Sequence, residues 1–218
     1  MINRRLGAAV PLLILALILG FAAKTSAWTS ADLDVNHMIQ SVRTPWLTVI
    51  AQGFNFGFNT IAGMITLVGA TAYLFATGRR TDAARTAVVI TAGWGLGAIY
   101  KIIVARPRPP AADSLVRRLA SDSFPSGHVC LTLSIVVAAA LLVRGTAASR
   151  LVVAVGAVLV VGQMLARVYL GAHYLTDTIG SLLVTTAALV LVVPATRRRT
   201  TDVLAEDVPE RLADSRSR

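Results

Sequence analysis

Two of the three histidines in this chain stand beside polar residues at the edges of long apolar runs, and one of them precedes a carboxylate. His173 and Asp177 are four positions apart. On a helix, residues at this spacing lie on one face, one turn from each other. The carboxylate could accept the Nδ1–H of the imidazole, which would fix the tautomer and leave Nε2 free to attack an electrophile. The pair predicts a nucleophilic histidine, although by itself it also describes an ordinary surface contact.

The second histidine, His128, ends the sequence Phe124-Pro125-Ser126-Gly127-His128, where another apolar run begins. Proline and glycine at a helix start leave backbone N–H groups unpaired, and the helix dipole adds to their attraction for an anion. Ser126 can donate a further hydrogen bond. The segment therefore predicts a phosphate-binding helix start, with a simple helix cap as the alternative.

Three cationic side chains adjoin these two segments. Lys101 and Arg108 precede the segment Phe124–His128, and Arg167 precedes His173. The planar guanidinium of arginine can bind two phosphoryl oxygens at once. Cations at the ends of apolar runs also serve simply to fix the depth of a span in the bilayer. That alternative fits Asp177 poorly, because a short carboxylate cannot reach the membrane surface.

Long apolar runs, uncharged apart from Lys101 and Asp177 near the ends of two of them, predict the elements that position these polar residues. Each run has about the ~20 residues that cross a hydrocarbon core as a helix. They are continuously apolar rather than alternating, which favours helices over a barrel. We therefore expect an all-α, polytopic membrane helix bundle with about six transmembrane helices. The expected spans are 6–23, 59–76, 86–104, 127–143, 151–166 and 174–195.

The composition agrees with a membrane protein. Of 218 residues, 55% are hydrophobic and only 15% are charged, and the mean hydropathy is +0.68. The net charge of +10 comes largely from short arginine clusters between apolar runs. No basic face or binding motif emerges, so we expect no nucleic-acid partner. The single cysteine, Cys130, is expected to be a small buried hydrophobe.

The distribution of basic residues predicts the orientation. Compact arginine clusters at 4–5, 79–85, 144–150 and 197–199 fall on one side of the membrane, which the positive-inside rule makes the cytoplasmic side. Both termini are then cytoplasmic. Lys101, His128, Arg167, His173 and Asp177 all fall at the opposite ends of their spans. We expect a plasma-membrane (inner-membrane) protein with its site at the outer face.

Several segments outside the spans have separate predictions. Residues 24–58 mix polar residues with aromatic ones, which is typical of interfacial helices. The first span could instead be a cleaved signal peptide, although its apolar run is longer than usual. We expect one membrane domain at 1–199 and a disordered polar tail at 200–218.

Three segments of the chain resemble the three motifs of the type-2 phosphatidic acid phosphatase superfamily. They are Lys101-x6-Arg108-Pro109, Pro125-Ser126-Gly127-His128 and Arg167-x5-His173-x3-Asp177. Six spans also match the membrane branch of that family. The resemblance implies hydrolysis of a lipid phosphate or diphosphate of the isoprenyl diphosphate, phosphatidic acid or phosphatidylglycerophosphate type.

The same resemblance implies a role for each residue. His173 would attack phosphorus and form a phosphohistidine, Asp177 would orient it, and His128 would protonate the leaving oxygen. The phosphoryl oxygens would be held by Lys101, Arg108, Ser126, the Gly127 amide and Arg167. Such a cationic pocket makes a magnesium ion unnecessary, so we expect no metal and no cofactor.

Some residues depart from the family pattern or lie outside it. The family usually has serine where this chain has Ala166, which would weaken phosphate binding if that hydroxyl contacts phosphate. Arg106, Arg117 and Arg118 are interpreted as solvated charges near lipid headgroups, with direct contact to the substrate as the alternative. Tyr169 and Tyr174 could anchor the interface or line the pocket.

Other functions stay open at this point. A membrane phosphotransferase would differ only in the acceptor of the phosphoryl group. Vanadium-dependent haloperoxidases share the motif set, but those relatives are soluble. A non-enzymatic anion-binding membrane protein would leave the pairing of His173 with Asp177 unexplained. The oligomeric state is not predicted.

Overall fold

The computed structural model describes residues 2–117 and 122–206, and within these it contains eight α-helices, one short 3-10 helix and no strand. This confirms the all-α prediction. The helices are α1 (Ile2–Ala22), α2 (Ser26–Gln40), α3 (Pro45–Gly57), α4 (Thr60–Ala76), α5 (Arg80–Val104), α6 (Gly127–Leu142), α7 (Ser149–Tyr169) and α8 (Leu175–Glu206), with the 3-10 helix at Ala111–Asp113.

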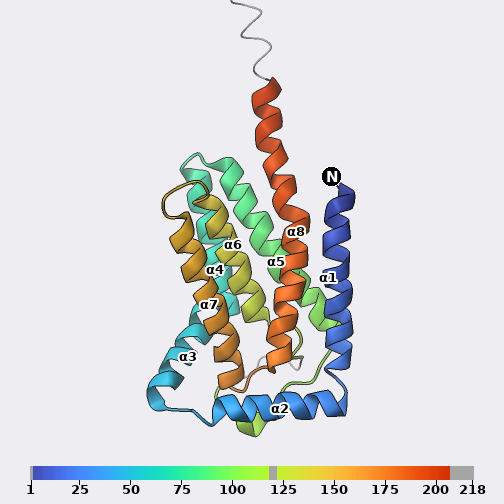
Figure 1. Cartoon of the computed structure of the whole chain (residues 1–218). Coiled ribbons are helices and arrows are strands. Elements are labelled where there is room, and N and C mark those ends of the chain that lie inside the picture. The colour runs from blue at the N-terminus through green and yellow to red at the C-terminus, as the bar shows by residue number, and fades with distance from the viewer. Residues whose placement is uncertain (1, 118–121, 207–218) are drawn as a thin grey trace, which may run out of the picture.

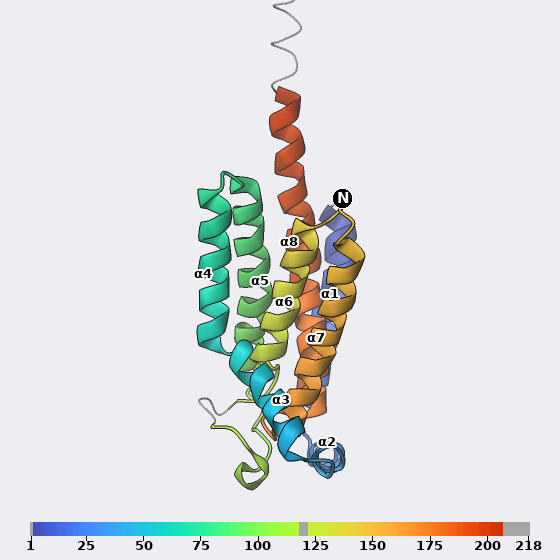
Figure 2. The same ribbon diagram turned by 90° about the vertical axis from the view of Figure 1, so that its left-hand side faces the viewer.

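The bundle is formed by helices that run alongside one another, namely α1, α4, α5, α6, α7 and α8, and α2 lies across one end of them (Figure 1). A view turned by 90° shows α3 inclined between that end and the bundle, with α4 and α5 side by side (Figure 2). We call the end covered by α2 the α2 end, and the end where α1 begins the α1 end.

The predicted number of spans is confirmed in outline. In the described part of the chain, four stretches are long and apolar enough to cross a bilayer: Asn3–Ala22, Arg80–Val104, Ser149–Tyr169 and Leu175–Val193. The helices α3 and α4, bent by 51° at their junction, together make a fifth. The sixth, α6, is an apolar helix of only 16 residues. Large apolar side chains such as Ile102 (79% exposed) and Ile61 (72%) face outward, as lipid-facing residues do.

The bundle is centred on α5, α6 and α8, which pack closely because small residues lie at their contacts. A Cβ added to Gly93 of α5 would lie 2.2 Å from the Ser134 Oγ of α6 and 3.0 Å from Thr185 of α8. Only glycine fits between these helices without a shift. Cys130 is fully buried in the same region, as predicted.

The first helix packs against α8 and α5. Ala16 joins a buried cluster with Tyr100, Val104, Phe124 and Val184, and the Tyr100 hydroxyl donates to the Leu13 carbonyl at 3.0 Å. At the other end of the chain, α8 continues to Glu206, past the boundary expected at 199. The sequence from 195 to 206 has no glycine or proline to end a helix. The rest of the expected tail, 207–218, lies outside the described residues.

Candidate active site

The residues singled out by the sequence lie at the α2 end. Lys101 is in the last turn of α5, Gly127 and His128 begin α6, Arg167 is in the last turn of α7, and Asp177 is in the first turn of α8. The connecting segments supply Arg108, Ser126 and His173. Neighbouring helices run in opposite directions, so these four helix ends meet at one level of the bundle (Figure 1).

His173 and Asp177 do not share a helix as their spacing suggested. The helix α8 begins at Leu175, so His173 precedes it and Tyr174 is the residue just before the first turn. Asp177 reaches back to accept the Tyr174 backbone N–H at 2.8 Å, the usual role of an acidic residue at the third helical position. His173 Nδ1 lies 3.5 Å from Asp177 Oδ2. The helix start therefore brings the pair together, in place of the single helix face.

The surroundings of His173 define its tautomer. Its Nε2 lies 3.3 Å from Arg108 Nη1. A guanidinium has only donors, so Nε2 must be the acceptor and the ring proton sits on Nδ1, toward Ser123 and Asp177. The Arg108 side chain is also held by the Ala172 carbonyl at 2.8 Å. Nε2 is thus unprotonated and lies beside a cation, as a nucleophile for an anionic phosphate requires.

Burial and charge keep His173 neutral. The residue is 1% exposed, and burial is the main cause that lowers its pKa well below the usual value. The positive charges of Arg108, Arg167 and Lys101 lower this pKa further. Neutral imidazole is the nucleophilic form, so these cations both attract a phosphate and preserve the lone pair.

The prediction that Arg106 is a solvated charge was wrong, because the residue is buried. It is 1% exposed and bridges two buried carboxylates, with Nη1 2.8 Å from Asp177 Oδ1 and Nη2 2.9 Å from Asp32 Oδ2. A buried carboxylate is costly unless it is paired, and Arg106 pairs two of them. The sequence offered no measure of burial for a short polar loop. Arg117, by contrast, is exposed, and Arg118 lies outside the described residues.

Tyr174 and Tyr169 are both buried and do not anchor the membrane surface. The Tyr174 ring lies under Arg106, whose guanidinium carbon is 4.0 Å from the ring centroid. The Tyr169 hydroxyl lies 2.9 Å from Thr48 Oγ1 and accepts the Thr44 backbone N–H at 3.0 Å. Tyr174 thus supports the site, whereas Tyr169 joins α7 to α3.

Asp177 is the centre of this hydrogen-bond network. Besides Arg106 and the Tyr174 amide, it accepts the hydroxyl of Ser123, which also lies 3.4 Å from His173 Nδ1. Ser123 is fully buried, and its backbone N–H donates to the Arg106 carbonyl at 2.7 Å. The sequence analysis did not single out Ser123, although it directly precedes the Phe124–His128 segment.

The opposite side of the pocket is formed by α3. Arg167 is 4% exposed, and its Nη1 donates to the Asn55 side-chain oxygen. One ring nitrogen of His128 hydrogen bonds the Asn55 backbone carbonyl. Arg167 Nε, His128 Nε2 and the Ser126 hydroxyl are buried and have no hydrogen-bond partner among the described residues. Three of the predicted site residues therefore keep unpaired polar atoms.

Two of the expected phosphate ligands also have structural partners. Lys101 Nζ donates to the carbonyls of Asp122 and Ser123, at 3.1 and 3.3 Å. The Ser126 backbone N–H donates to Ser181 Oγ at 2.9 Å, so this amide already has a partner. Gly127 is the first residue of α6, where its lack of a side chain leaves the backbone approachable.

The interfacial helix α2 contributes a polar stripe that the sequence analysis missed. Trp28, Asp32, Asn36 and Gln40 recur every four residues, so they lie on one face. Trp28 donates to Thr176 Oγ1 at 3.0 Å, Asn36 to the His173 carbonyl at 3.1 Å and Gln40 to the Val168 carbonyl at 3.3 Å. Asp32 holds Arg106. This spacing of four was the signal that could have identified the stripe.

The turn between α7 and α8 depends on Gly171, which has φ of +68°. A Cβ at this position would lie 2.2 Å from the Asp113 carbonyl oxygen, so both conformation and space require glycine. The Leu115 N–H donates to the Leu170 carbonyl at 2.9 Å, joining the Arg108 segment to this turn. The turn therefore places His173 against the loop that carries Arg108.

Ala166 packs among apolar side chains against α3. It is 5% exposed and belongs to an apolar cluster with Ala51, Tyr169 and Leu170, against which Leu47 and Phe54 also pack. A serine hydroxyl at this position in the present structure would face α3. The substitution at this position therefore removes no hydroxyl from the pocket described above.

A buried histidine backed by a carboxylate and facing arginines, at one end of a membrane helix bundle, has the groups needed to bind a phosphate and attack it. The comparisons agree. The family model described as the PAP2 superfamily matches residues 82–201. Phosphatidylglycerophosphatase B of Bacillus subtilis (strain 168) is 31% identical over 179 residues, covering 78% of this chain and 86% of the relative. The chain therefore belongs to the PAP2 superfamily and is a membrane phosphatase.

Solved structures show the same fold. The crystal structure of a transmembrane PAP2-type phosphatidylglycerolphosphate phosphatase from Bacillus subtilis matches with a TM-score of 0.77 and 27% identity, over 87% of this chain and 96% of that one. The crystal structure of Aquifex aeolicus LpxE matches with a TM-score of 0.58 and 21% identity, over 73% and 93%. The second similarity is one of fold.

Proposed function

We propose that this phosphatase hydrolyses the phosphomonoester of a membrane lipid through a phosphohistidine at His173, with phosphatidylglycerophosphate as its leading substrate. The observation that carries the mechanism is the His173 geometry: Nε2 is unprotonated, lies 3.3 Å from Arg108, and has Asp177 behind Nδ1. The name of the 31% identical relative supports the choice of substrate.

In the first step, the Nε2 lone pair attacks phosphorus and the bond from phosphorus to the lipid oxygen breaks. The negative charge of the bound phosphate offsets the cations around His128, so His128 binds a proton in the complex and gives it to that oxygen, and the lipid leaves as an alcohol. The His173 ring becomes cationic, and the Asp177 carboxylate stabilises it through Nδ1–H. Arg108, Arg167, Lys101 and the Ser126 hydroxyl bind the phosphoryl oxygens as their charge develops.

In the second step, water attacks the phosphohistidine and the P–N bond breaks. His128, now neutral, takes a proton from the water, and inorganic phosphate leaves. The unpaired atoms of Arg167, Ser126 and His128 support this assignment, because buried donors of this kind gain a partner when a phosphate binds. A second lipid in place of water would make the enzyme a phosphotransferase.

Phosphate release from purified protein in detergent with EDTA tests the proposal. The panel holds phosphatidylglycerophosphate, phosphatidic acid and an isoprenyl diphosphate. His173→Ala should lower the rate by about 10⁴-fold or more, since the nucleophile is lost. His37→Ala is the matched control, because His37 is an exposed histidine whose side chain contacts Asp113 on the surface.

Each outcome decides one part. Appreciable turnover by His173→Ala would refute the phosphohistidine, and loss of activity in EDTA that magnesium restores would refute the metal-free mechanism. Preference for another lipid of the panel would replace the substrate. Phosphate transfer to an added lipid alcohol, with little phosphate release, would establish the phosphotransferase.

A further inference from the structure

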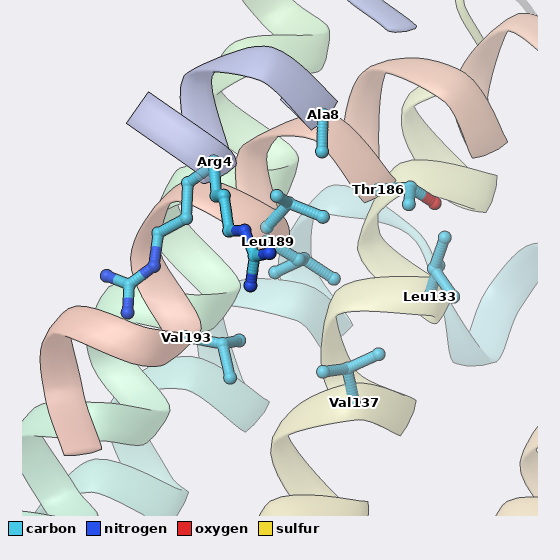
Figure 3. Close-up of a pocket in the computed structure, with 9 residues that line it drawn as sticks. Arg4, Ala8, Leu133, Val137, Thr186, Leu189 and Val193 are labelled. Carbon is cyan, nitrogen blue, oxygen red and sulfur yellow. The ribbon is translucent and has the colours of Figure 1, made fainter. Parts of the chain in front are cut away.

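A groove at the α1 end lies far from the catalytic residues and opens on the side of the bundle. It has a volume of about 640 Å³ and is lined by α1, α6 and α8. Figure 3 shows the side chains around it, with Arg4 and Ala8 from α1, Leu133 and Val137 from α6, and Thr186, Leu189 and Val193 from α8. The lining is apolar apart from Thr186 and the arginines, so the groove suits a hydrocarbon chain.

Two arginines give this groove a charge. Arg4 and Arg5 belong to its lining, and neither has an ion pair or hydrogen bond with any residue in the described ranges. At the same end, Arg79 and Arg85 both pair with Asp82, at 2.8 and 3.1 Å. Arg4 and Arg5 also lie in the first turn of α1, where the helix dipole is positive. The groove therefore joins an apolar slot to unpaired positive charge.

A neighbouring hollow extends this positive region around α8. It has a volume of about 410 Å³, shares Val193 with the groove and includes Arg85 and Arg144 in its lining. The two hollows present four arginines at the level where span ends meet lipid headgroups. Basic pockets between spanning helices at this level attract anionic headgroups.

We propose that the groove binds an anionic glycerophospholipid of the leaflet at the α1 end, separate from any substrate bound at the α2 end. One acyl chain lies along α8 between α1 and α6, and the phosphodiester is bound by Arg4 and Arg5. Charge complementarity selects this occupant over a zwitterionic lipid with the same chains, whose ammonium group would face the same arginines.

Native mass spectrometry of the delipidated full-length protein tests this site. Phosphatidylglycerol and phosphatidylcholine with identical chains are titrated against wild type, Arg4→Gln/Arg5→Gln and the control Arg80→Gln/Arg150→Gln. The control removes two exposed arginines at the same end that do not line the groove. Ala8→Phe, which adds a ring to the groove lining, is the fourth protein.

Loss of Arg4 and Arg5 should weaken phosphatidylglycerol binding by about 30-fold, because each cation contributes roughly a tenfold gain in affinity or less. The affinity for phosphatidylcholine should be nearly unchanged. The control variant should change the affinity for phosphatidylglycerol by less than about threefold. Ala8→Phe should weaken both lipids. Phosphate release should stay within twofold of wild type in all variants, because none of these residues is near His173.

Three outcomes would overturn the site. Equal losses in the two arginine pairs would mean diffuse surface charge, unchanged binding in Arg4→Gln/Arg5→Gln would mean that lipid binds elsewhere, and unchanged binding in Ala8→Phe would remove the acyl chain from the groove. Thermal unfolding of each variant in detergent identifies any that misfolds, and Ala8→Phe tests the groove without altering charge.

Discussion

Two arginine–aspartate contacts at opposite ends of the bundle have similar geometry and different surroundings. At the α1 end, Arg79 lies 2.8 Å from Asp82, and the two side chains are 48% and 26% exposed. At the α2 end, Arg106 lies 2.8 Å from Asp177, with exposures of 1% and 0%. Exposed pairs contribute little to stability, whereas removing one partner of a buried pair leaves a charge without solvent. Distance alone therefore says little about which pair matters.

The largest effect should come from breaking the buried pair. Arg106→Gln leaves Asp32 and Asp177 close together without their shared cation, and we expect a loss of about 3–5 kcal/mol in the free energy of unfolding. Arg79→Gln should cost about 1 kcal/mol or less. Thermal or denaturant unfolding in one detergent measures both. Equal losses would mean that burial does not separate the two ends.

Arg167→Lys refines the comparison, because it keeps the positive charge and changes the geometry of the hydrogen-bond donors. Lysine cannot supply the two parallel donors of a guanidinium, so we expect kcat/KM for the lipid to fall by about 10²-fold. Arg150→Lys, at the exposed α1 end, should leave it unchanged. Steady-state phosphate release gives both values. Wild-type kinetics in Arg167→Lys would show that only the charge is required.

Asp32→Asn tests whether α2 takes part in the chemistry. Without the Asp32 charge, Arg106 is drawn wholly to Asp177, which weakens the hold of that carboxylate on the His173 ring. We expect kcat to fall by about tenfold, the effect of roughly 1.4 kcal/mol, with little change in KM. Asp34→Asn is the matched control, because Asp34 is an exposed residue of the same helix.

In this experiment, kcat and the unfolding temperature together distinguish a positioning role of Asp32 from a structural one. A merely structural role for Asp32 would lower the unfolding temperature and leave kcat per folded molecule unchanged. Recovery of kcat in Asp32→Glu would support the positioning role, because glutamate restores the charge. Failure of Asp32→Asn to alter kcat would limit the chemistry to the residues around His173.

The smallest effect is expected at Ala166. Ala166→Ser restores the family's usual residue but places a hydroxyl among apolar side chains near α3. Substrate affinity should stay the same, and stability should fall by about 1 kcal/mol, a modest cost because a helical serine can bond its own backbone. KM and the unfolding temperature measure the two. A clear decrease in KM would place this hydroxyl at phosphate.

Much of the fold could be predicted, because apolar runs of bilayer length leave few alternatives to helices. Part of the candidate site could be predicted from polar residues near helix ends, such as Lys101 and Asp177, because antiparallel packing brings these ends to one level. Arg106 and Asp32 could not be recognised in this way. Burial of a charge depends on what folds over it, and the loop containing Arg106 is covered by a helix from another part of the chain.

The polar stripe of α2 has a consequence for the order in which the enzyme is assembled. Its partners follow it in the chain by 74 residues at Arg106, 128 at Val168, 137 at His173 and 148 at Thr176. During synthesis α2 is made early. Its bond to Arg106 can form once the segment after α5 has been made, whereas its bonds to Val168, His173 and Thr176 need the last two spans. A nascent chain that has inserted only its first spans therefore holds Asp32 without a counter-ion and lacks the proposed nucleophile, His173. Under the proposed mechanism, the enzyme becomes active only after α8 has been inserted.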